Sequence, residues 1–384
     1  MNKKDFLSAM GDIDDRFIEE AENYSRSDAK KWLKYGGLAA CLLICALCFS
    51  LFGGKPESNK ETNREKVTVS DLPVLTIERR YVSNDTRERR VSAASGLEDG
   101  NPWSEDVEID TLPVYENTTF DQNDTPASVS DGELETYIND IAESTEMNVE
   151  SIRYSRKKEE KNLDKSFKAE AETAEGTITV YSSHLAIVEY SESLTLPEEY
   201  RVPTSVMTKE QAQKVTDYLL EEYGEVMGFE NAKGTVQVEY DEQDNARWYL
   251  MGYESAEDQK EEVLNYNLKR INFVLNQEGD LEAIVMVDNM ACGREIEEYP
   301  LITTEKAEEM LRENYEGKIT EESQIENIRL IYLAGEEYSL FLPYYAFDVR
   351  ASEGGDSGEG NLVNYETYYV LAIPEQYVVE LPKN

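Results

Sequence analysis

The hydrophobic residues of this chain follow several patterns, and the plainest is a long apolar run near the N-terminus. Residues 35–54 carry no charged side chain over twenty positions. A helix of that length is about 30 Å long, which matches the hydrocarbon core of a bilayer. With Trp32 and Tyr35 as interfacial aromatic residues, the pattern predicts a transmembrane helix over residues 32–54.

Two other interpretations of the apolar run are less favoured. A charged segment of about thirty residues precedes it and no small-residue cleavage site closes it, which argues against a cleaved signal peptide. Residues 38–41 spell a lipobox, but a lipobox ends its apolar segment, and here the apolar run follows the cysteine. Lys30, Lys31 and Lys34 beside the span favour a cytoplasmic N-terminus and an extracytoplasmic C-terminal region in the cell membrane.

Before the span, residues 3–24 repeat apolar side chains at helical spacing. Gly11 followed by Asp12 indicates a break, so two short helices are predicted rather than one. A segment this short cannot bury its apolar face alone, so we expect it to dock onto a cytoplasmic protein partner. The inner leaflet and a second copy are the alternatives. The residues expected to make the contact are Phe6, Met10, Ile13, Phe17 and Ile18.

After the span, residues 55–66 are polar and without periodicity, which is typical of a tether. Short apolar pieces follow, and Pro73, Pro102 and Pro113 argue that they are edge strands or extended arms. The pattern leaves open whether residues 78–101 are ordered.

Further along, a helix-like run followed by alternating, strand-like runs occurs three times. The three helices are expected to begin with N-caps at Ser130, Thr208 and Thr304. The predicted class is therefore α+β: N-terminal short helices and one transmembrane helix, then extracytoplasmic helix-over-antiparallel-sheet units in tandem. The predicted division of the chain is 1–31, 32–54, 55–125, 126–200, 201–300 and 301–384.

The charge balance narrows the possible functions. The chain has 38 Lys and Arg against 80 Asp and Glu, a formal net charge of −42, and almost all of the excess follows the span. A field this negative repels phosphate backbones, so nucleic-acid binding is not expected. His184 is the sole histidine, which argues against a Ser–His–Asp catalytic triad or a zinc site with several histidine ligands. It is expected to be structural, with a pH-sensing role as the alternative.

No catalytic, cofactor-binding or metal-binding residue is assigned, and we do not expect an enzyme. No P-loop, G-x-S-x-G, H-E-x-x-H or paired C-x-x-C sequence occurs in the chain. Acidic residues are so frequent that the sequence does not distinguish a catalytic pair of carboxylates from ordinary surface carboxylates. An extracytoplasmic hydrolase that uses carboxylates is therefore only a third alternative.

The cysteines divide into two groups. Cys41, Cys45 and Cys48 share one face of the predicted span, where they would pack, or alternatively form a dimer seam. Cys292 is alone in the outer region. A hydrophobic core rather than disulfides is therefore expected to hold that region together.

Tyrosines gather in the last predicted strands. Tyr344, Tyr345, Tyr368 and Tyr369 could line an outer recognition groove, because tyrosine suits wet interfaces. The alternative is that these rings cover a half-exposed face of a sheet.

Two N-terminal runs resemble the start of a group of uncharacterised single-pass membrane proteins of clostridia-type Firmicutes. The runs are AMGDIDDRFIEEA at residues 9–21 and KWLKYGGLAAC at residues 31–41. Similar segments of the same group correspond to residues 72–77, 101–103, 112–117, 299–307 and 364–370. Some members of the broader group look like anti-sigma factors, although their zinc-binding His/Cys pattern is absent here. The outer layout is similar to PepSY-type or cystatin-like modules and to accessory proteins that restrain a cell-wall sensor kinase.

Together these patterns predict a regulatory single-pass membrane protein. Its acidic outer region would bind an unknown ligand or protein, and its short inner segment would hold a cytoplasmic partner. The alternative is a membrane-tethered binding or inhibitor module with no signalling role.

Overall fold

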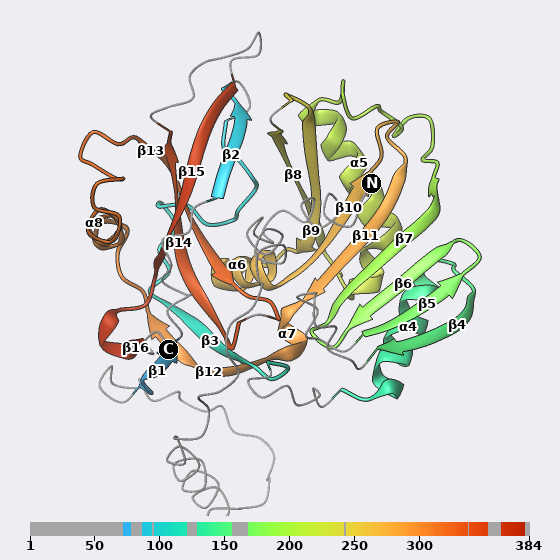
Figure 1. Ribbon diagram of the computed structural model, residues 1–384, viewed down its shortest axis with the longest axis horizontal. Helices are drawn as coiled ribbons and strands as arrows, with labels where there is room; N and C mark the ends of the chain where they lie inside the picture. The colour runs from blue at the N-terminus through green and yellow to red at the C-terminus, as the bar shows by residue number, and fades with distance from the viewer. Residues whose placement is uncertain are drawn as a thin grey trace, which may run out of the picture.

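The structure is a computed structural model that describes residues 72–77, 87–93, 96–120, 129–155, 168–241, 243–336, 338–351 and 362–380. Within these ranges sixteen strands form three sheets, and five α-helices accompany them (Figure 1). The fold is therefore mostly β, and the predicted α+β class with tandem helix-over-sheet units is wrong. No helix in the described ranges is long and apolar enough to cross a membrane. The predicted short helices at 3–24 and the predicted span at 32–54 lie outside them.

An eight-stranded antiparallel sheet joins what the sequence suggested were two separate units. Its order is β4-β5-β6-β7-β11-β10-β9-β8. The strands are β4 (Val149–Ser155), β5 (Lys168–Thr173), β6 (Gly176–Tyr181), β7 (Leu185–Leu194), β8 (Ala232–Tyr240), β9 (Ala246–Glu254), β10 (Lys269–Leu275) and β11 (Leu281–Asp288). The join is the pairing of β7 with β11, in which Val188 lies opposite Ile284. The division at residue 200 stays a prediction, but strands from both sides of it share this sheet.

Two helices pack on one face of the eight-stranded sheet. They are α4 (Asp131–Ser144) and α5 (Lys209–Tyr223), and their apolar side chains share one core with the sheet. Ser130 and Thr208 cap them, and each forms a capping box with the residue three positions on. The predictions of these two N-caps are confirmed, because the capping signal is local in sequence.

A six-stranded sheet forms the other half of the molecule. Its order is β12-β3-β14-β15-β2, and β13 pairs with the other side of β14. The strands are β2 (Arg87–Ser92), β3 (Thr111–Asn117), β12 (Gly293–Pro300), β13 (Ile325–Leu333), β14 (Leu340–Arg350) and β15 (Leu362–Leu371). α8 (Thr304–Asn314) contacts β15 and is capped by Thr303, one residue before the predicted cap.

Pro113 lies in β3 between two neighbouring strands, which is not the edge position that the sequence suggested. Proline is tolerated there because β14 pairs only with Tyr115 and Glu116, beyond the proline. The carbonyl of Pro113 instead accepts a hydrogen bond of 2.7 Å from the hydroxyl of Tyr332.

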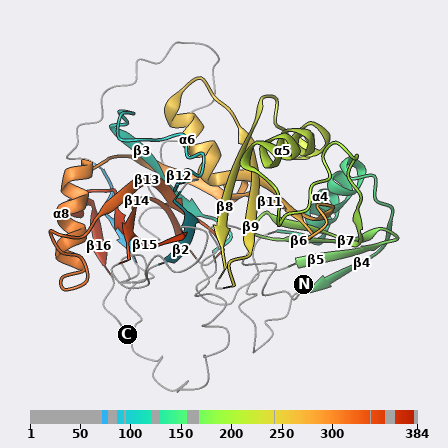
Figure 2. The same cartoon turned by 90° about the horizontal axis from the view of Figure 1, so that it is seen from above.

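The two large sheets meet through β2, which contacts β8, and through α6 (Gln259–Leu268), which contacts β9, β10 and β13. Figure 2 shows α6 between the two sheets. A small parallel pair, β1 (Leu75–Ile77) and β16 (Val378–Glu380), forms the third sheet. The remaining short elements are η2 (Gly224–Met227), α7 (Asn289–Cys292) and η3 (Glu375–Tyr377).

Candidate functional site

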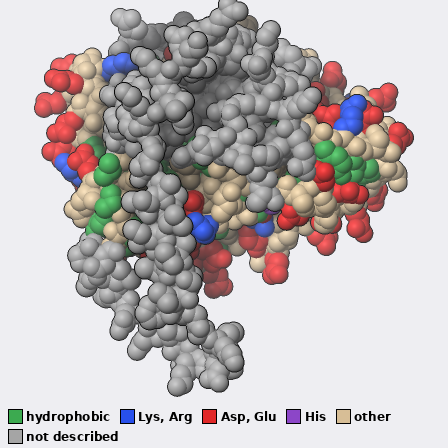
Figure 3. Space-filling view, turned by 60° about the horizontal axis from the view of Figure 1, so that its bottom comes forward, with side chains coloured by type: hydrophobic (Ala, Val, Ile, Leu, Met, Phe, Trp, Pro, Cys, Tyr) green, Lys and Arg blue, Asp and Glu red, His purple; other side chains and the backbone are tan. Residues whose placement is uncertain are grey.

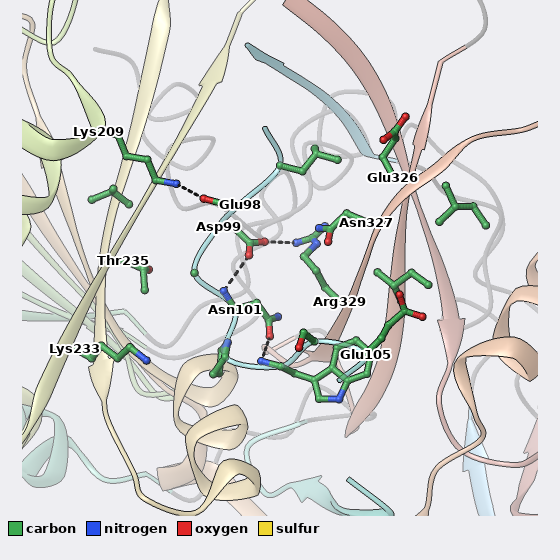
Figure 4. Close-up of a pocket in the computed structure, with 18 of the residues that line it drawn as sticks. Glu98, Asp99, Asn101, Glu105, Lys209, Lys233, Thr235, Glu326, Asn327 and Arg329 are labelled. Carbon is green, nitrogen blue, oxygen red and sulfur yellow. Dashed lines mark hydrogen bonds and ion pairs between the residues drawn. The ribbon is translucent and has the colours of Figure 1, made fainter. Parts of the chain in front are cut away.

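A cleft of about 870 Å³ lies between the two halves of the molecule. One wall comes from the start of α5 and from β8, and the other from α8 and the first part of β13. Between these walls runs the segment 97–105, which we call the strap (Figure 4). The charged and amide residues of the lining are Glu98, Asp99, Asn101, Glu105, Lys209, Gln213, Lys233, Glu308, Arg312, Glu326, Asn327 and Arg329.

Short-range hydrogen bonds shape the strap and fasten it to β13. Asp99 Oδ1 accepts from the backbone N–H of Asn101 at 3.0 Å, and Asn101 Oδ1 accepts from that of Trp103 at 2.9 Å. Such Asx turns bend the chain locally. Asn101 Nδ2 donates to the carbonyl of Leu330 at 3.2 Å, and Arg329 Nη1 donates to Asp99 Oδ2 at 3.0 Å.

The strap also lies tightly against β8. Gly100 has a φ of +79°, and a Cβ atom there would lie 2.5 Å from Thr235 Cγ2. Glycine is therefore required twice, for the left-handed backbone and for the close approach. The backbone carbonyl of Asp99 accepts a bond of 3.5 Å from the hydroxyl of Tyr266 on α6. The strap is thus held by both sheets and by the helix between them.

Behind the strap, a buried group of charges connects the two sheets. Arg89 on β2 bonds Glu239 on β8 at 2.8 Å and Asp348 on β14 at 2.9 Å. Arg329 on β13 reaches the same Asp348 at 3.2 Å while its other arm binds Asp99. Asp348 is completely buried, and the hydroxyl of Thr367 donates to it as well. We call these five residues, Arg89, Asp99, Glu239, Arg329 and Asp348, the buried ion network.

The pKa of Asp348 reports the balance of forces in this network. Burial alone would raise the pKa of the carboxyl group, because it disfavours the charged form. The guanidinium groups of Arg329 and Arg89 outweigh burial and lower the pKa to about 2. Asp348 is therefore ionised at neutral pH and holds both arginines in place.

Charges in the cleft are unevenly satisfied. Each of the four cations has an acidic partner: Lys209 with Glu98 at 3.0 Å, Lys233 with Glu262 at 2.8 Å, Arg312 with Glu308 at 2.6 Å, and Arg329 in the buried ion network. Glu105 and Glu326 are exposed, and within the described ranges neither has an ion-pair partner. The cleft therefore offers unpaired negative charge and hydrogen-bonding groups.

The tyrosines predicted as an outer recognition site lie in the core instead. Tyr344, Tyr345 and Tyr368 are buried, and Tyr369 is half-buried. The ring of Tyr345 lies 5.6 Å from that of Trp103, so it anchors the strap. None of the four tyrosines is among the described residues that line the cleft. The predicted docking residues Phe6, Met10, Ile13, Phe17 and Ile18 lie outside the described ranges.

The remaining residues singled out by the sequence are structural in character. His184 ends the turn between β6 and β7 with a left-handed φ of +60°, and its ring lies 6.1 Å from that of Tyr137. Burial lowers its pKa, although Asp288 and Glu133 pull in the opposite direction. Cys292 is buried and forms no disulfide within the described ranges. Burial raises the pKa of its thiol to about 11. A thiol with such a pKa is a poor nucleophile.

Sequence reasoning missed the buried ion network. Its members come from residues 89 to 348, so no local spacing relates them. The sequence singled out only a neighbouring segment, Asn101-Pro102-Trp103 in the strap, through its similarity to the group of single-pass membrane proteins. The described ranges contain no group of three or more His, Cys, Asp or Glu side chains placed to hold a metal ion.

Comparisons with known proteins leave the function to be argued from this site. No protein-family model matches the sequence. No curated protein sequence matches it either. Among solved structures, the chain is similar to an uncharacterized protein from Eubacterium rectale, with a TM-score of 0.35 and 11% identity. That alignment covers 68% of this chain and 82% of the other. A TM-score this low supports no conclusion about fold or function.

Proposed function

We propose that the described part of the chain is an extracytoplasmic binding module, that the cleft is its binding site, and that the predicted span at 32–54 holds it at the membrane. The observation that carries the proposal is the cleft itself. It is a polar space of about 870 Å³ whose walls belong to different sheets and whose base is fixed by the strap. Clefts between two packed halves of a protein are common places for ligands.

The lining favours binding over catalysis. Its residues supply carboxylates, amides and cations, and most of these side chains are already committed to bonds that hold the scaffold. Neither a histidine nor a cysteine is among the described residues that line the cleft. The groups left over, the carboxylates of Glu105 and Glu326, can attract and orient a positively charged partner.

A regulatory role would join this outer binding to the predicted inner segment. In that case, binding of a partner in the cleft would change which cytoplasmic protein residues 1–24 bind. A single rigid span transmits no obvious change, so coupling would need a change in oligomeric state or regulated proteolysis. The alternative remains a tethered binding or inhibitor module in which the inner segment only sets the topology.

Site-directed photo-crosslinking in living cells tests the binding site. A benzoylphenylalanine in place of Ser104 or Lys209, both exposed in the cleft, should give discrete adducts on irradiation. The same group in place of Glu150, exposed on the edge strand β4, is the matched control and should give none of these adducts. An identical adduct pattern at all three positions, or no adduct at either cleft position, would overturn the proposal.

Replacing residues 1–24 by an unrelated polar sequence of the same length separates the regulatory role from the tether. Under the regulatory role, the cleft adducts should persist while the set of cytoplasmic proteins that co-purify changes. An unchanged set of co-purifying proteins would leave only the tethered module.

A further inference from the structure

The edge of β13 that faces the cleft has backbone groups available for pairing. β13 pairs with β14, and in the described ranges no other strand pairs with it. Tyr332 lies opposite Pro343, which has no N–H to give, and the N–H of Tyr332 bonds Asn267 on α6 instead. Tyr332 therefore points its backbone groups away from β14. By the two-residue period of a strand, so do Leu330 and Ile328.

The strap uses only part of this edge. The carbonyl of Leu330 is taken by Asn101, at the point where the strap meets β13. The N–H of Leu330 and both backbone groups of Ile328 lie beyond that contact. Ile328 is among the residues that line the cleft, and the strand alternation places its N–H and carbonyl on the edge away from β14. An extended chain that entered the cleft would find there two backbone donors and one acceptor, the kinds of group by which a strand is added to a sheet.

The opposite wall is less suitable for pairing. On β8 the carbonyl of Gly234 already accepts a bond of 3.1 Å from Gln213. Further along, β2 contacts β8, and Arg89 bonds Glu239 there. β13 is therefore the wall that can take an added strand.

Charge determines which chains would be accepted at this edge. The register of β13 against β14 shifts between Ile325 and Asn327, so that Glu326 is the extra residue of a β-bulge. A bulge with a charged side chain keeps an edge from pairing with arbitrary strands. Together with Glu105, Glu326 selects for positive charge in the incoming chain. The described surface visible in Figure 3 carries many acidic side chains and few basic ones. The long-range field of the protein therefore also attracts a positively charged chain.

We infer that the partner in the cleft is an extended peptide segment with basic side chains, which adds to the edge of β13 at Ile328 while Glu105 and Glu326 receive its positive charges. This inference rests on the proposed function, because it names the class of partner for the same cleft. The backbone bonds give a short pairing, and the two carboxylates give the selectivity.

Isothermal titration calorimetry with the full-length protein in detergent tests the inference. The probe is a capped peptide of about eight residues that alternates Lys and Thr. It should bind, a Glu–Thr peptide of the same length should not, and raising the salt from about 50 to about 300 mM should weaken binding. N-methylation of alternate residues keeps the charge and removes backbone donors, so it should weaken binding by roughly tenfold or more.

The protein variant and its control separate the site from the general acidity of the molecule. Glu326→Gln should weaken binding of the Lys–Thr peptide several-fold, whereas Glu150→Gln on β4 should leave it unchanged. Equal affinity for the N-methylated peptide, or equal effects of the two variants, would overturn the inference. If the peptide fails to bind while the crosslinks at Ser104 and Lys209 persist, the inference falls and the proposed function stands.

Discussion

Asp348 is the carboxylate that both arginines of the buried ion network share. It is completely buried, and it binds one guanidinium from β2 and another from β13. Breaking a buried ion pair by removing one partner costs about 3–5 kcal/mol, because the remaining charge is buried without compensation. Here a single change would remove one of the two acidic partners of each arginine, because Arg89 also binds Glu239 and Arg329 also binds Asp99.

We therefore predict that Asp348→Asn lowers the free energy of unfolding by about 3–5 kcal/mol at neutral pH. Urea denaturation followed by circular dichroism measures this quantity. Asp110→Asn is the control, since Asp110 is exposed and the same charge is removed. A loss no larger than that of Asp110→Asn would contradict the role assigned to the buried ion network.

The same carboxylate gives a prediction in acid. Its folded pKa of about 2 lies below the value of about 3.9 for an unfolded aspartate. A lowered pKa contributes stability that is fully present above the unfolded value and is lost as the pH falls through the folded value. The difference in unfolding free energy between the wild type and Asp348→Asn should therefore shrink from about pH 4 to about pH 2. A difference that stays constant over this window would show that the folded pKa is not lowered.

His184 also has a lowered pKa, because burial disfavours its charged form more than Asp288 and Glu133 favour it. The unfolded chain then binds the proton more readily, so the wild type should lose stability as the pH falls below about 6.5. Asn tolerates the left-handed backbone of this turn. We predict that His184→Asn removes this pH dependence between about pH 7 and pH 5. The midpoint of urea unfolding checks it, and parallel curves for the two proteins would refute it.

The strap is the element that fixes the base of the cleft, and its position depends on Gly100. Gly100→Ala places a Cβ atom 2.5 Å from Thr235 Cγ2 at a backbone φ of +79°. We predict a loss of about 1–3 kcal/mol in unfolding free energy and faster proteolysis within residues 97–105. Gly96→Ala is the matched control, since its φ is +64° and nothing lies within 4 Å of the added atom. If the two variants behave alike, only the backbone conformation matters and the contact with Thr235 does not.

Elements whose signals are local could be predicted from the sequence. The caps at Ser130 and Thr208 were predictable because a capping box spans only four residues. For α8 the cap was predicted at Thr304, but the cap is Thr303, the threonine next to it. Tyr344, Tyr345 and Tyr368 were predictable as strand residues, but their burial depends on α8, the strap and β3, which lie far away in the sequence.

Pairings between distant strands were beyond sequence reasoning. The predicted units 126–200 and 201–300 each present an apolar strand at one edge, and nothing local indicates that β7 and β11 then pair. The walls of the cleft come from both halves of the molecule. The cleft could therefore not be predicted without knowing how strands of the two halves are placed. The nearest signal was the strap itself, in a stretch whose order the sequence left open.

The sheet that units 126–200 and 201–300 share predicts that both units unfold together. Ile284→Ala in β11 removes buried volume at the pairing with Val188 and should cost about 2–5 kcal/mol. Because one core spans α4, α5 and the sheet, amides of β5 and β9 should lose protection to the same extent. Hydrogen exchange followed by mass spectrometry measures both strands at once. Loss of protection in β9 but not in β5 would show two independent units, and Glu150→Ala on the surface should change neither.

The parallel pair of β1 and β16 has a mechanical consequence. Leu75 lies opposite Val378, so the first described strand is fastened to the last. Tension that arrives through the residues preceding β1 would be borne first as shear across this pair, and only then by the two large sheets. Pulling the protein away from a surface by its N-terminal side should accordingly release the C-terminal strand before the cleft is deformed.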